Sequence, residues 1–375
     1  MSELHSLEFR STIRSEGRLE LSLERVEVPT PQADEVVVRI DATPINPADL
    51  LSLLGPADPA MFRVGSNTSR PTAWADIAPA QLTQFASRLD MPMGLGTEGA
   101  GQIVGTGAAS RHFLGQTVAA RSSLGMYAQY RVVKATDCLL LPQGVTARQG
   151  ASALINPLTA LGMLETLRRE GHTALVHTAA ASNLGQMLNR LCLEDQVPLI
   201  NIVRTAAQVA LLKQQGARHV LDSSSPTFES DLLAVLIDTG ATLAFDAIGG
   251  GTMAGTLLRG MEKALNARTE NFSRYGSPAH KQVYTYGVLD PGPKVLEGNM
   301  GMAWGVGGWL MTWFYETLDP ARVLQLRGRV ASGLTSTFAS HYTSQISPND
   351  ALLPEMIRAY SQRTTGEKFL LCPNG

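Results

Sequence analysis

Short apolar runs separated by proline and glycine fill residues 20–150. Their apolar positions alternate with polar ones or are rich in β-branched residues, and each run predicts a short strand. The runs lie at residues 19–28, 35–42, 101–105, 116–120, 128–133 and 138–141. Strands of this length and spacing predict a compact all-β or barrel-like first domain. Residues 151–170 then show helical periodicity, and we expect them to lead into a second domain.

Beyond residue 172 the pattern changes to strands that alternate with helices. An amphipathic stretch at 185–194 follows the first apolar run of this part. The apolar runs lie at residues 173–177, 198–203, 243–249 and 282–289, with one more ending at Val220. This alternation predicts an α/β domain with a doubly wound parallel sheet and right-handed crossovers. After about residue 316 the rhythm is lost, and a helix near 351–362 and a strand at 367–372 are expected to return to the first domain.

One connection is unusually long. Residues 58–92 show no clear strand, are rich in proline, asparagine, serine and threonine, and contain one expected helix at 79–89. Connections of this length are functional lids or loosely packed insertions. The sequence leaves both possibilities open.

The composition adds limits on size and partners. With 375 residues and 44% hydrophobic content, the chain is long enough for two domains with large cores. A formal net charge of −2 and a pI near 6.4 give no sign of binding to nucleic acid or to a membrane surface. The N-terminal residues are charged and lack an apolar signal core. The apolar stretch at 300–315 is interrupted by glycine and is too short to span a membrane.

Cysteine and histidine usage indicates neither disulfides nor a metal site. The three cysteines, Cys138, Cys192 and Cys372, are isolated in the sequence, which is typical of a protein in a reducing cytoplasm. The seven histidines are scattered, and no pair has a spacing that favours metal binding. We therefore expect a cytoplasmic protein with no bound metal.

The turn between the run at 173–177 and the helix at 185–194 carries the clearest sign of chemistry. The positions that align with a G-x-G-x-x-G fingerprint are Ala180, Ser182 and Gly185. Small residues that open a helix let the backbone approach a pyrophosphate, which then lies at the helix N-terminus. A strand-to-helix turn without a ligand is the alternative. The cofactor-binding residues predicted here are Ala180, Ala181, Ser182, Asn183, Leu184 and Gly185.

Arg204 indicates which dinucleotide binds. About 20 residues after such a turn, an acidic residue at the end of the second strand would bind the ribose 2′-hydroxyl and exclude NADP. This chain has Arg204 there, and a guanidinium suits a bidentate hold on phosphate. The predicted cofactor is NADPH; a solvated cation is the alternative for Arg204. Residues 94–99 match the fingerprint letter for letter but lack a strand before and a helix after, so we predict no phosphate site there.

The turns after the fourth and fifth strands are further candidates. In an open parallel sheet, ligands lie across the carboxyl ends of the strands. The residues expected to border the nicotinamide ribose are Ala247, Ile248, Gly249, Tyr286 and Gly287. The glycines at 249–251 are equally typical of an ordinary loop and helix cap.

The order of the motifs resembles the medium-chain dehydrogenase/reductase superfamily, on its zinc-free branch of quinone oxidoreductases and enoyl-thioester reductases. The resemblance covers nearly the whole chain outside residues 58–92. It rests on N-P-A-D within 45–49, G-T-E-G-A-G within 95–101, Y-A-Q-Y at 127–130, N-P-L-T-A at 156–160 and G-W-L at 308–310. The second of these motifs lacks the zinc-binding histidine of the alcohol dehydrogenases.

The resemblance implies a fold, a site and an assembly. It implies a GroES-like catalytic domain (1–150, completed by 316–375) and a Rossmann NADPH-binding domain (151–315). It places Asn46 and Thr159 near the reactive nicotinamide as catalytic residues, with Asn156 beside the cofactor. A turn-forming asparagine and an N-terminal helix residue are the alternatives for Asn46 and Thr159. Family members also pair through the last strand of the nucleotide domain, here within 303–309, which implies a homodimer.

One departure from the family concerns the proton donor. Enoyl-thioester reductases have a tyrosine shortly after the N-P-S-D motif, whereas residues 50–57 of this chain contain none, and Leu51 stands where quinone reductases often have an aromatic residue. The predicted function is a zinc-independent NADPH-dependent reductase that acts on a small molecule, either an activated alkene or a quinone. A zinc-free carbonyl or alcohol dehydrogenase and a non-catalytic NADPH-binding protein are the alternatives.

Overall fold

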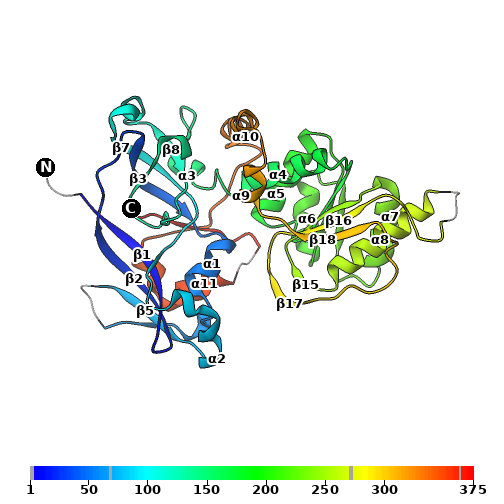
Figure 1. Cartoon of the computed structure of the whole chain (residues 1–375), viewed down its shortest axis with the longest axis horizontal. Helices are drawn as coiled ribbons and strands as arrows, with labels where there is room; N and C mark the ends of the chain where they lie inside the picture. Colours follow the sequence, from blue (N-terminus) through cyan, green and yellow to red (C-terminus); the bar gives the residue numbers. More distant parts are fainter. Residues whose placement is uncertain (1–3, 67–69, 270–272, 363–364) are drawn as a thin grey trace. The chain divides into compact units, whose positions relative to one another are not determined.

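The computed structural model describes residues 4–66, 70–269, 273–362 and 365–375. The chain divides into two compact units. The first consists of Met1–Ile155 and Arg327–Gly375, and the second of Asn156–Leu326. The first unit is thus built from both ends of the chain, and helix α10 (Pro320–Gly333) contains the second division point (Figure 1).

The first unit contains two sheets. One has the order β4-β5-β2-β1-β6 and is formed by β1 (His5–Arg14), β2 (Arg18–Glu27), β4 (Arg63–Val64), β5 (Thr72–Asp76) and β6 (Met93–Gly94). The other has the order β10-β8-β7-β3-β20-β19, and β9 also pairs with β3. Its strands are β3 (Glu35–Pro44), β7 (Gly99–Thr106), β8 (Thr117–Ala120), β9 (Tyr130–Lys134), β10 (Leu139–Leu140), β19 (Ser344–Ile346) and β20 (Phe369–Leu371). Because β20 pairs with β3 in this sheet, the end of the chain completes the first unit.

Three helices pack with these sheets. They are α1 (Pro47–Leu54), α3 (Ala147–Gly150) and α11 (Pro354–Ser361). Leu53 of α1 and Ile357 of α11 are fully buried and share a core with Ile13 and Leu21 of the first sheet. This apolar contact fixes α1, and therefore Asn46 at its N-terminus, against the sheet.

The long connection differs from its sequence expectation, because it contains a strand. β5 pairs antiparallel with β2 along its whole length, and Ala73 and Ala75 are completely buried. The period-two pattern of β5 is hard to recognise because its inward residues are alanines, which give a weak hydrophobic signal. The helix expected at 79–89 is a short helix α2 (Pro79–Leu82) followed by a 3₁₀ segment, η2 (Thr83–Arg88). This part of the insertion belongs to the sheet and its core.

The second unit is a six-stranded parallel sheet with the order β13-β12-β11-β14-β16-β18. The strands are β11 (Leu175–His177), β12 (Leu199–Val203), β13 (His219–Asp222), β14 (Leu243–Asp246), β16 (Lys281–Thr285) and β18 (Trp304–Gly308). The order reverses between β11 and β14, which is the topology of a doubly wound nucleotide-binding fold. The predicted fold class is confirmed.

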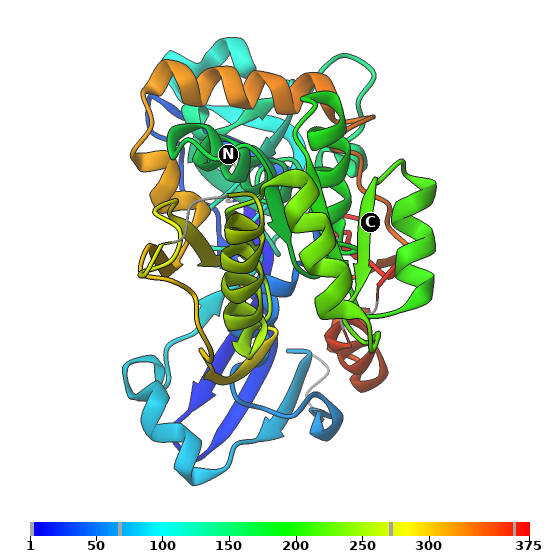
Figure 2. The same cartoon turned by 90° about the vertical axis from the view of Figure 1, so that its right-hand side faces the viewer.

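Helices cover both faces of this sheet (Figure 2). They are α4 (Asn156–Arg169), α5 (Asn183–Glu194), α6 (Ala206–Gln214), α7 (Phe228–Thr239), α8 (Met253–Ala267), α9 (Met311–Glu316) and part of α10. Ile200 and Ile202 of β12 share a core with α7 and α8, whereas the amide of Asn201 bonds Asn189 of α5 on the other face. Successive residues of a strand point to opposite faces of the sheet. Helices α7 and α8 therefore lie on the opposite side of the sheet from α5.

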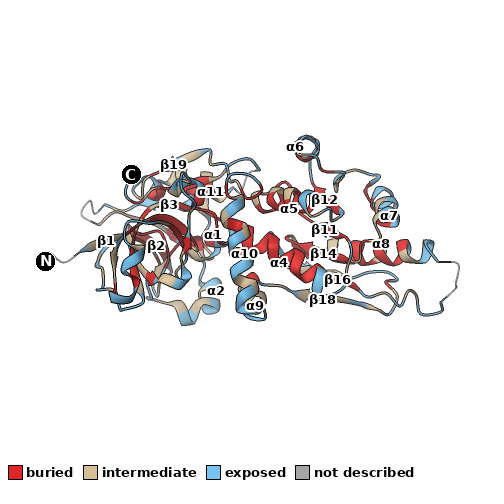
Figure 3. Ribbon diagram, turned by 90° about the horizontal axis from the view of Figure 1, so that it is seen from above, coloured by how far each residue is buried: buried red, intermediate tan, exposed pale blue. Residues whose placement is uncertain are grey.

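Burial in the second unit is concentrated along the sheet and its nearest helices. α4 is buried continuously from Pro157 to Leu167, whereas α10 is mostly exposed or half-buried (Figure 3). A small two-stranded sheet of β15 (Gly249–Gly251) and β17 (Asp290–Lys294) lies after the central strands. Among the helices that the structure describes, none is long and apolar enough to cross a membrane.

Candidate functional site

The turn between β11 and α5 brings the backbone and the helix N-terminus close together. A Cβ atom at Gly185 would lie 2.2 Å from the Ala180 carbonyl oxygen, so only glycine fits there. Ala179 has a φ of +52°, a conformation that costs a non-glycine residue free energy. The Ser182 hydroxyl accepts the Gly185 N–H at 3.1 Å and caps the helix. The turn therefore has no room for a larger side chain at Gly185, and its backbone packs closely against the start of α5.

The predicted residues of this turn follow one another in the chain, and most of them are buried. Ala180 and Ala181 are buried, and Asn183 and Leu184 form the first turn of α5. The Ala180 N–H donates to Ile202 of β12 at 3.1 Å, which fixes the turn to the neighbouring strand. The turn itself is formed by residues close in sequence, which is why the sequence pattern could predict it.

Buried Asp246 fixes the turn after β14 to the turn after β11. The Thr178 hydroxyl donates to Asp246 Oδ1 at 2.7 Å and accepts the Ala247 N–H at 2.8 Å. The carboxylate also accepts the N–H groups of Ile248 (3.0 Å) and Gly249 (3.1 Å). Ala247, Ile248 and Gly249 are thereby held at the carboxyl end of the sheet, beside the β11–α5 turn.

Tyr286 and Gly287 complete this edge. The Tyr286 hydroxyl lies 2.7 Å from His177 Nε2, and the two rings are stacked. Burial lowers the pKa of His177 to about 3, so the imidazole is neutral, and burial also raises the pKa of Tyr286. A Cβ at Gly287 would lie 2.8 Å from the Ala247 carbonyl oxygen. Tyr286 thus uses its hydroxyl inside the protein, and the backbone of this turn is the part that a ligand can meet.

Arg204 directly follows β12 and is exposed. Its N–H donates to Gln208 Oε1 at 2.9 Å, while the Thr205 hydroxyl caps α6. No acidic side chain occurs within residues 199–208. The end of β12 therefore offers a cation, where an NAD-specific site would have a carboxylate.

The first unit contains a second cluster, around Asn46 and Glu98. Both side chains are buried, with 2% and 1% of their surface exposed. Asn46 Nδ2 donates to Glu98 Oε1 at 2.9 Å. Glu98 Oε2 accepts the N–H groups of Leu154 and Ile155 at 2.8 and 3.0 Å. One carboxyl group therefore joins the N-terminus of α1 to the segment that leads into α4.

The charge of Glu98 is balanced only in part. Burial raises the pKa of Glu98 to about 7, although the Lys368 ammonium and the hydrogen bonds to the carboxylate act in the opposite direction. Burial lowers the pKa of Lys368 to about 8, and Glu98 opposes that shift. Lys368 Nζ donates to Ser152 Oγ at 2.7 Å, and Ser152 Oγ lies 2.7 Å from the Tyr342 hydroxyl. A chain of polar groups thus adjoins Glu98.

Asp49 ties the same helix to the 95–97 segment. Asp49 Oδ1 accepts the Thr97 N–H at 3.0 Å, and Oδ2 accepts the Asn46 N–H at 2.9 Å and the Tyr127 hydroxyl at 3.1 Å. Burial raises the pKa of Asp49, and burial together with Asp49 raises that of Tyr127. Tyr127 is a buried structural donor.

Asn156 and Thr159 lie in the first turn of α4, in the second unit, and Thr159 is buried. Asn46 belongs to the first unit. The joint role of Asn46 and Thr159 therefore stays a prediction. Sequence reasoning did not select Glu98, Lys368, Ser152 or Tyr342 as site residues. For Glu98, the G-T-E-G-A-G motif was the available signal; the other three have none, since they meet only through folding.

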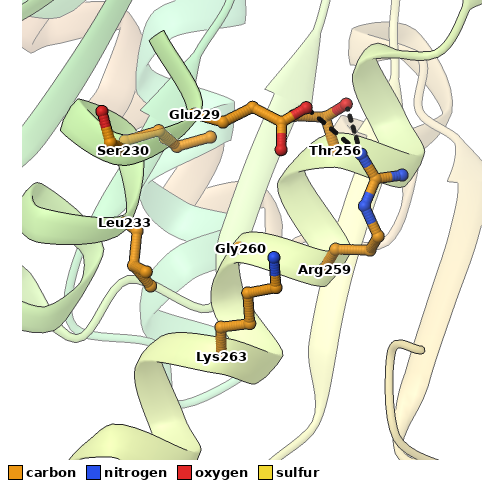
Figure 4. Close-up of a pocket in the computed structure, with 8 residues that line it drawn as sticks. Glu229, Ser230, Leu233, Thr256, Arg259, Gly260 and Lys263 are labelled. Carbon is orange, nitrogen blue, oxygen red and sulfur yellow. Dashed lines mark hydrogen bonds and ion pairs between the residues drawn. The ribbon is translucent and has the colours of Figure 1, made fainter. Parts of the chain in front are cut away.

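A hollow of about 150 Å³ lies elsewhere, between α7 and α8 (Figure 4). Arg259 reaches across it to Thr256 (3.2 Å) and Glu229 (3.5 Å), and Lys263 lies at its rim. None of its lining residues is a predicted site residue. The strand ends of the second unit and the Asn46–Glu98 cluster of the first unit remain two separate candidate sites.

Comparison with known proteins agrees with this geometry. Residues 32–143 match the alcohol dehydrogenase GroES-like domain. A quinone oxidoreductase of Pseudomonas aeruginosa is 29% identical over 163 residues, which are 42% of this chain and 50% of that protein. A mitochondrial enoyl-[acyl-carrier-protein] reductase of Caenorhabditis elegans is 27% identical over 237 residues, 61% of this chain and 60% of the relative. The matches thus span about half the length of these curated relatives.

Solved structures share the whole fold. A protein from Mesorhizobium loti, provisionally designated an NADPH:quinone reductase, superimposes with a TM-score of 0.72 at 23% identity and 100% coverage of both chains. The complex of Etr1p with NADP and crotonyl-CoA gives a TM-score of 0.69 at 16% identity, covering 99% of this chain and 100% of the other. The chain thus shares the fold of these solved structures, and part of it matches the GroES-like domain. The curated relatives to which it is similar include a quinone oxidoreductase and an enoyl reductase.

Proposed function

We propose that this chain is an NADPH-dependent reductase that passes a hydride to an activated alkene or a quinone without zinc. The observation that carries the proposal is the β11–α5 turn, where Gly185 leaves no room for a side chain and Arg204 follows the next strand. The names of the relatives, which are quinone oxidoreductases and enoyl reductases, support the reaction class. The NADP complex among the solved structures supports the cofactor.

The residues present fit a phosphorylated dinucleotide. A pyrophosphate would lie on the N–H groups at the start of α5, where a helix favours negative charge. Arg204 would hold the 2′-phosphate, and the backbone of 247–249 and 287 would border the nicotinamide ribose. When bound, the reduced nicotinamide supplies the hydride. The protein's part is to hold the nicotinamide and the acceptor in a reactive orientation.

Zinc independence is part of the proposal. The G-T-E-G-A-G segment has no histidine, and Glu98 is already held by one side-chain and two backbone donors. In the ranges that the structure describes, no three His, Cys, Asp or Glu side chains are grouped as metal ligands. Polarisation of the acceptor carbonyl would then come from hydrogen-bond donors. The proton donor for alkene reduction stays unassigned.

The second part of the proposal is a homodimer in which two copies of the chain pair along β18. β18 is an edge strand, and an exposed edge needs cover. Trp304 on this strand is 37% exposed, and Met302, Leu310 and Trp313 nearby are 46–77% exposed. A second copy paired along β18 would cover both the edge and these side chains, and the molar mass in solution tests this directly.

The experiment for the activity is NADPH oxidation at 340 nm against a quinone, an enone, an enoyl thioester and a saturated ketone, repeated with NADH. Turnover of an unsaturated acceptor or quinone, with NADPH preferred, would support the proposal. Turnover of the saturated ketone alone would favour a zinc-free carbonyl or alcohol dehydrogenase. Cofactor binding without turnover would favour a non-catalytic NADPH-binding protein.

Arg204→Glu tests the cofactor assignment. A charge-assisted contact to phosphate contributes about 1.5–3 kcal/mol, so we expect NADPH affinity to fall at least tenfold while NADH affinity changes little. Equal losses for both dinucleotides would remove Arg204 from the phosphate site. The matched control is Lys213→Glu, at an exposed lysine on α6.

A further inference from the structure

The first unit contains a cavity of about 510 Å³ that is lined by none of the candidate site residues. Its walls come from β1, the end of β2, β6, the loop at 123–124 and β9. The volume lies in the range of small-molecule sites, about 300–1,000 Å³. Two arginines line this cavity, Arg10 on β1 and Arg131 on β9.

The two arginines share one buried glutamate. Glu8 Oε1 lies 2.9 Å from Arg131 Nη1, and Glu8 Oε2 accepts from Arg10 Nη2 at 3.0 Å. The side chains of Glu8 and Arg131 are only 6% and 9% exposed. Burial lowers the pKa of Arg131, whereas Glu8 opposes that shift and Arg10 adds to it. The two guanidinium groups and the one carboxylate leave this cluster with a net charge of +1.

The two glutamates nearby do not cancel this charge. Glu24 accepts from Arg70 at 2.8 Å, which is closer than its contact of 3.6 Å with Arg10. Glu27 lines the cavity, but it is exposed, so water and salt screen its charge. The uncompensated positive charge therefore stays with Arg10 and Arg131.

Both arginines also keep a buried N–H group without a partner. The Nε atoms of Arg10 and Arg131 are buried, and neither has a hydrogen-bond partner among the residues that the structure describes. A buried donor without an acceptor costs free energy, and such a group calls for an explanation. A guanidinium group stays protonated and can only donate. The missing partner is therefore an acceptor, and the net charge favours an anion.

Much of the remaining lining is apolar. It includes Val26, Val28, Pro29, Pro92, Met93 and Leu124. Leu124 is 64% exposed, so an apolar ligand at the rim would cover it.

We propose that this cavity binds an organic monocarboxylate, whose carboxylate accepts from Arg10 and Arg131 and whose apolar part covers Leu124. One negative charge matches the net charge of the cluster, and a planar carboxylate suits guanidinium donors. A neutral apolar molecule would leave both Nε–H groups unpaired. This site is separate from the proposed reductase activity and does not depend on it.

The experiment is calorimetric titration of the whole protein with octanoate, in a buffer without phosphate, carboxylates or dinucleotide. Octanamide has the same apolar part without the charge, and acetate has the charge without the apolar part. Because a charge-assisted hydrogen bond is lost, we expect octanamide to bind at least tenfold more weakly than octanoate. Acetate should also bind at least tenfold more weakly, since it cannot reach the apolar lining.

Three variants locate the site. Arg131→Met should weaken octanoate binding about 10- to 150-fold. Glu8→Gln should strengthen it about three- to tenfold, because the competing carboxylate is gone. Leu124→Ser should weaken octanoate binding about tenfold and leave acetate binding unchanged. Arg18→Met is the matched control, since Arg18 pairs with Asp76 at the other end of β2.

Several results would overturn the proposal. If the parent protein does not bind octanoate, or binds octanamide equally well, the cavity is no carboxylate site. If Arg131→Met and Leu124→Ser leave octanoate binding unchanged, octanoate binds elsewhere. Equal affinities for acetate and octanoate would contradict the role of the apolar lining. Leu124 is exposed, so Leu124→Ser decides the question even if the loss of Arg131 prevents folding.

Discussion

The two units each bury a glutamate, and the two are satisfied in opposite ways. Glu262 on α8 meets the Lys281 ammonium at 2.7 Å and accepts from Asn266 and Ser277. Burial raises its pKa, but these partners outweigh burial and the net shift is downward. Glu98 is held by an amide and two backbone N–H groups. Among the described residues no cation lies within ion-pair distance of it, and its pKa rises to about 7.

The difference separates a carboxylate that holds the fold from one that prepares a site. The partners of Glu262 include a cation, which offsets the cost of burying its charge. Glu98 has only neutral hydrogen-bond donors in direct contact among the described residues, so the cost of burial outweighs them and its pKa rises. Groups whose pKa is raised by burial collect at functional sites, because a ligand can supply what the fold withholds. Substitutions at the partners of each glutamate test this contrast.

The largest expected effect is a loss of stability in Lys281→Met. Removing the ammonium leaves a buried carboxylate without its cation, which typically costs 3–5 kcal/mol, so unfolding in urea should occur at a clearly lower concentration. NADPH affinity of the folded protein should change by less than about twofold, since the ion pair lies outside the candidate site. Lys263→Met, at an exposed lysine next to Glu262 on α8, is the control. A loss of NADPH affinity without a loss of stability would erase the distinction between the two glutamates.

The pH dependence of stability comes next in size. Because the folded-state pKa of Glu98 lies above its ordinary value of 4.5, the folded protein binds this proton more tightly than the unfolded chain does. Its contribution to stability is therefore greatest at low pH and falls as the pH rises from about 4.5 to about 7. For Lys368 the pKa is lowered from 10.5 to about 8, so stability recovers from about pH 8 to 10.5. We expect a minimum between these ranges.

The difference in stability between Glu98→Gln and the parent, measured as a function of pH, isolates the contribution of Glu98 to the pH dependence. The charged groups that act on Glu98 or on Lys368 are each other, Asp49 and the phenols of Tyr127 and Tyr342. In thermal unfolding, the parent should lose several degrees relative to Glu98→Gln between pH 5 and 7, given about 2–4 °C per kcal/mol for units of this size. A constant difference across this range would show that Glu98 keeps an ordinary pKa.

The elements of the second unit could be predicted from the sequence because the signals for them are local. Ala180, Ser182 and Gly185 lie in one turn, and Arg204 directly follows the next strand. Hydrophobic periodicity fixes the strands and helices around them, so the position of this turn at the sheet edge follows from the order of elements.

The first unit was harder to predict because its contacts join distant segments. Glu98 meets Asn46 across 52 positions, and Lys368 meets Ser152 across 216. No spacing rule links such residues. The β5 strand was missed for a different reason, since its buried positions, Ala73 and Ala75, are too small to stand out in a polar segment. Predictions from the pattern therefore fail where packing of small residues or long-range polar contacts decides the structure.

The smallest expected effect is a change in the pH dependence of stability in Lys368→Met. The ammonium favours the charged form of Glu98, so its removal should raise the pKa of Glu98 further and move the fall in stability to higher pH by about one unit. The recovery above pH 8 should disappear, because the lysine that causes it is gone. Ser152 keeps the Tyr342 hydroxyl as a partner, which limits other damage. Lys368→Arg keeps the charge and should retain the parental fall below pH 7. If Lys368→Met leaves the pH profile unchanged, Lys368 neither lowers the pKa of Glu98 nor causes the recovery above pH 8, and Glu98 differs from Glu262 in having no cation that acts on it.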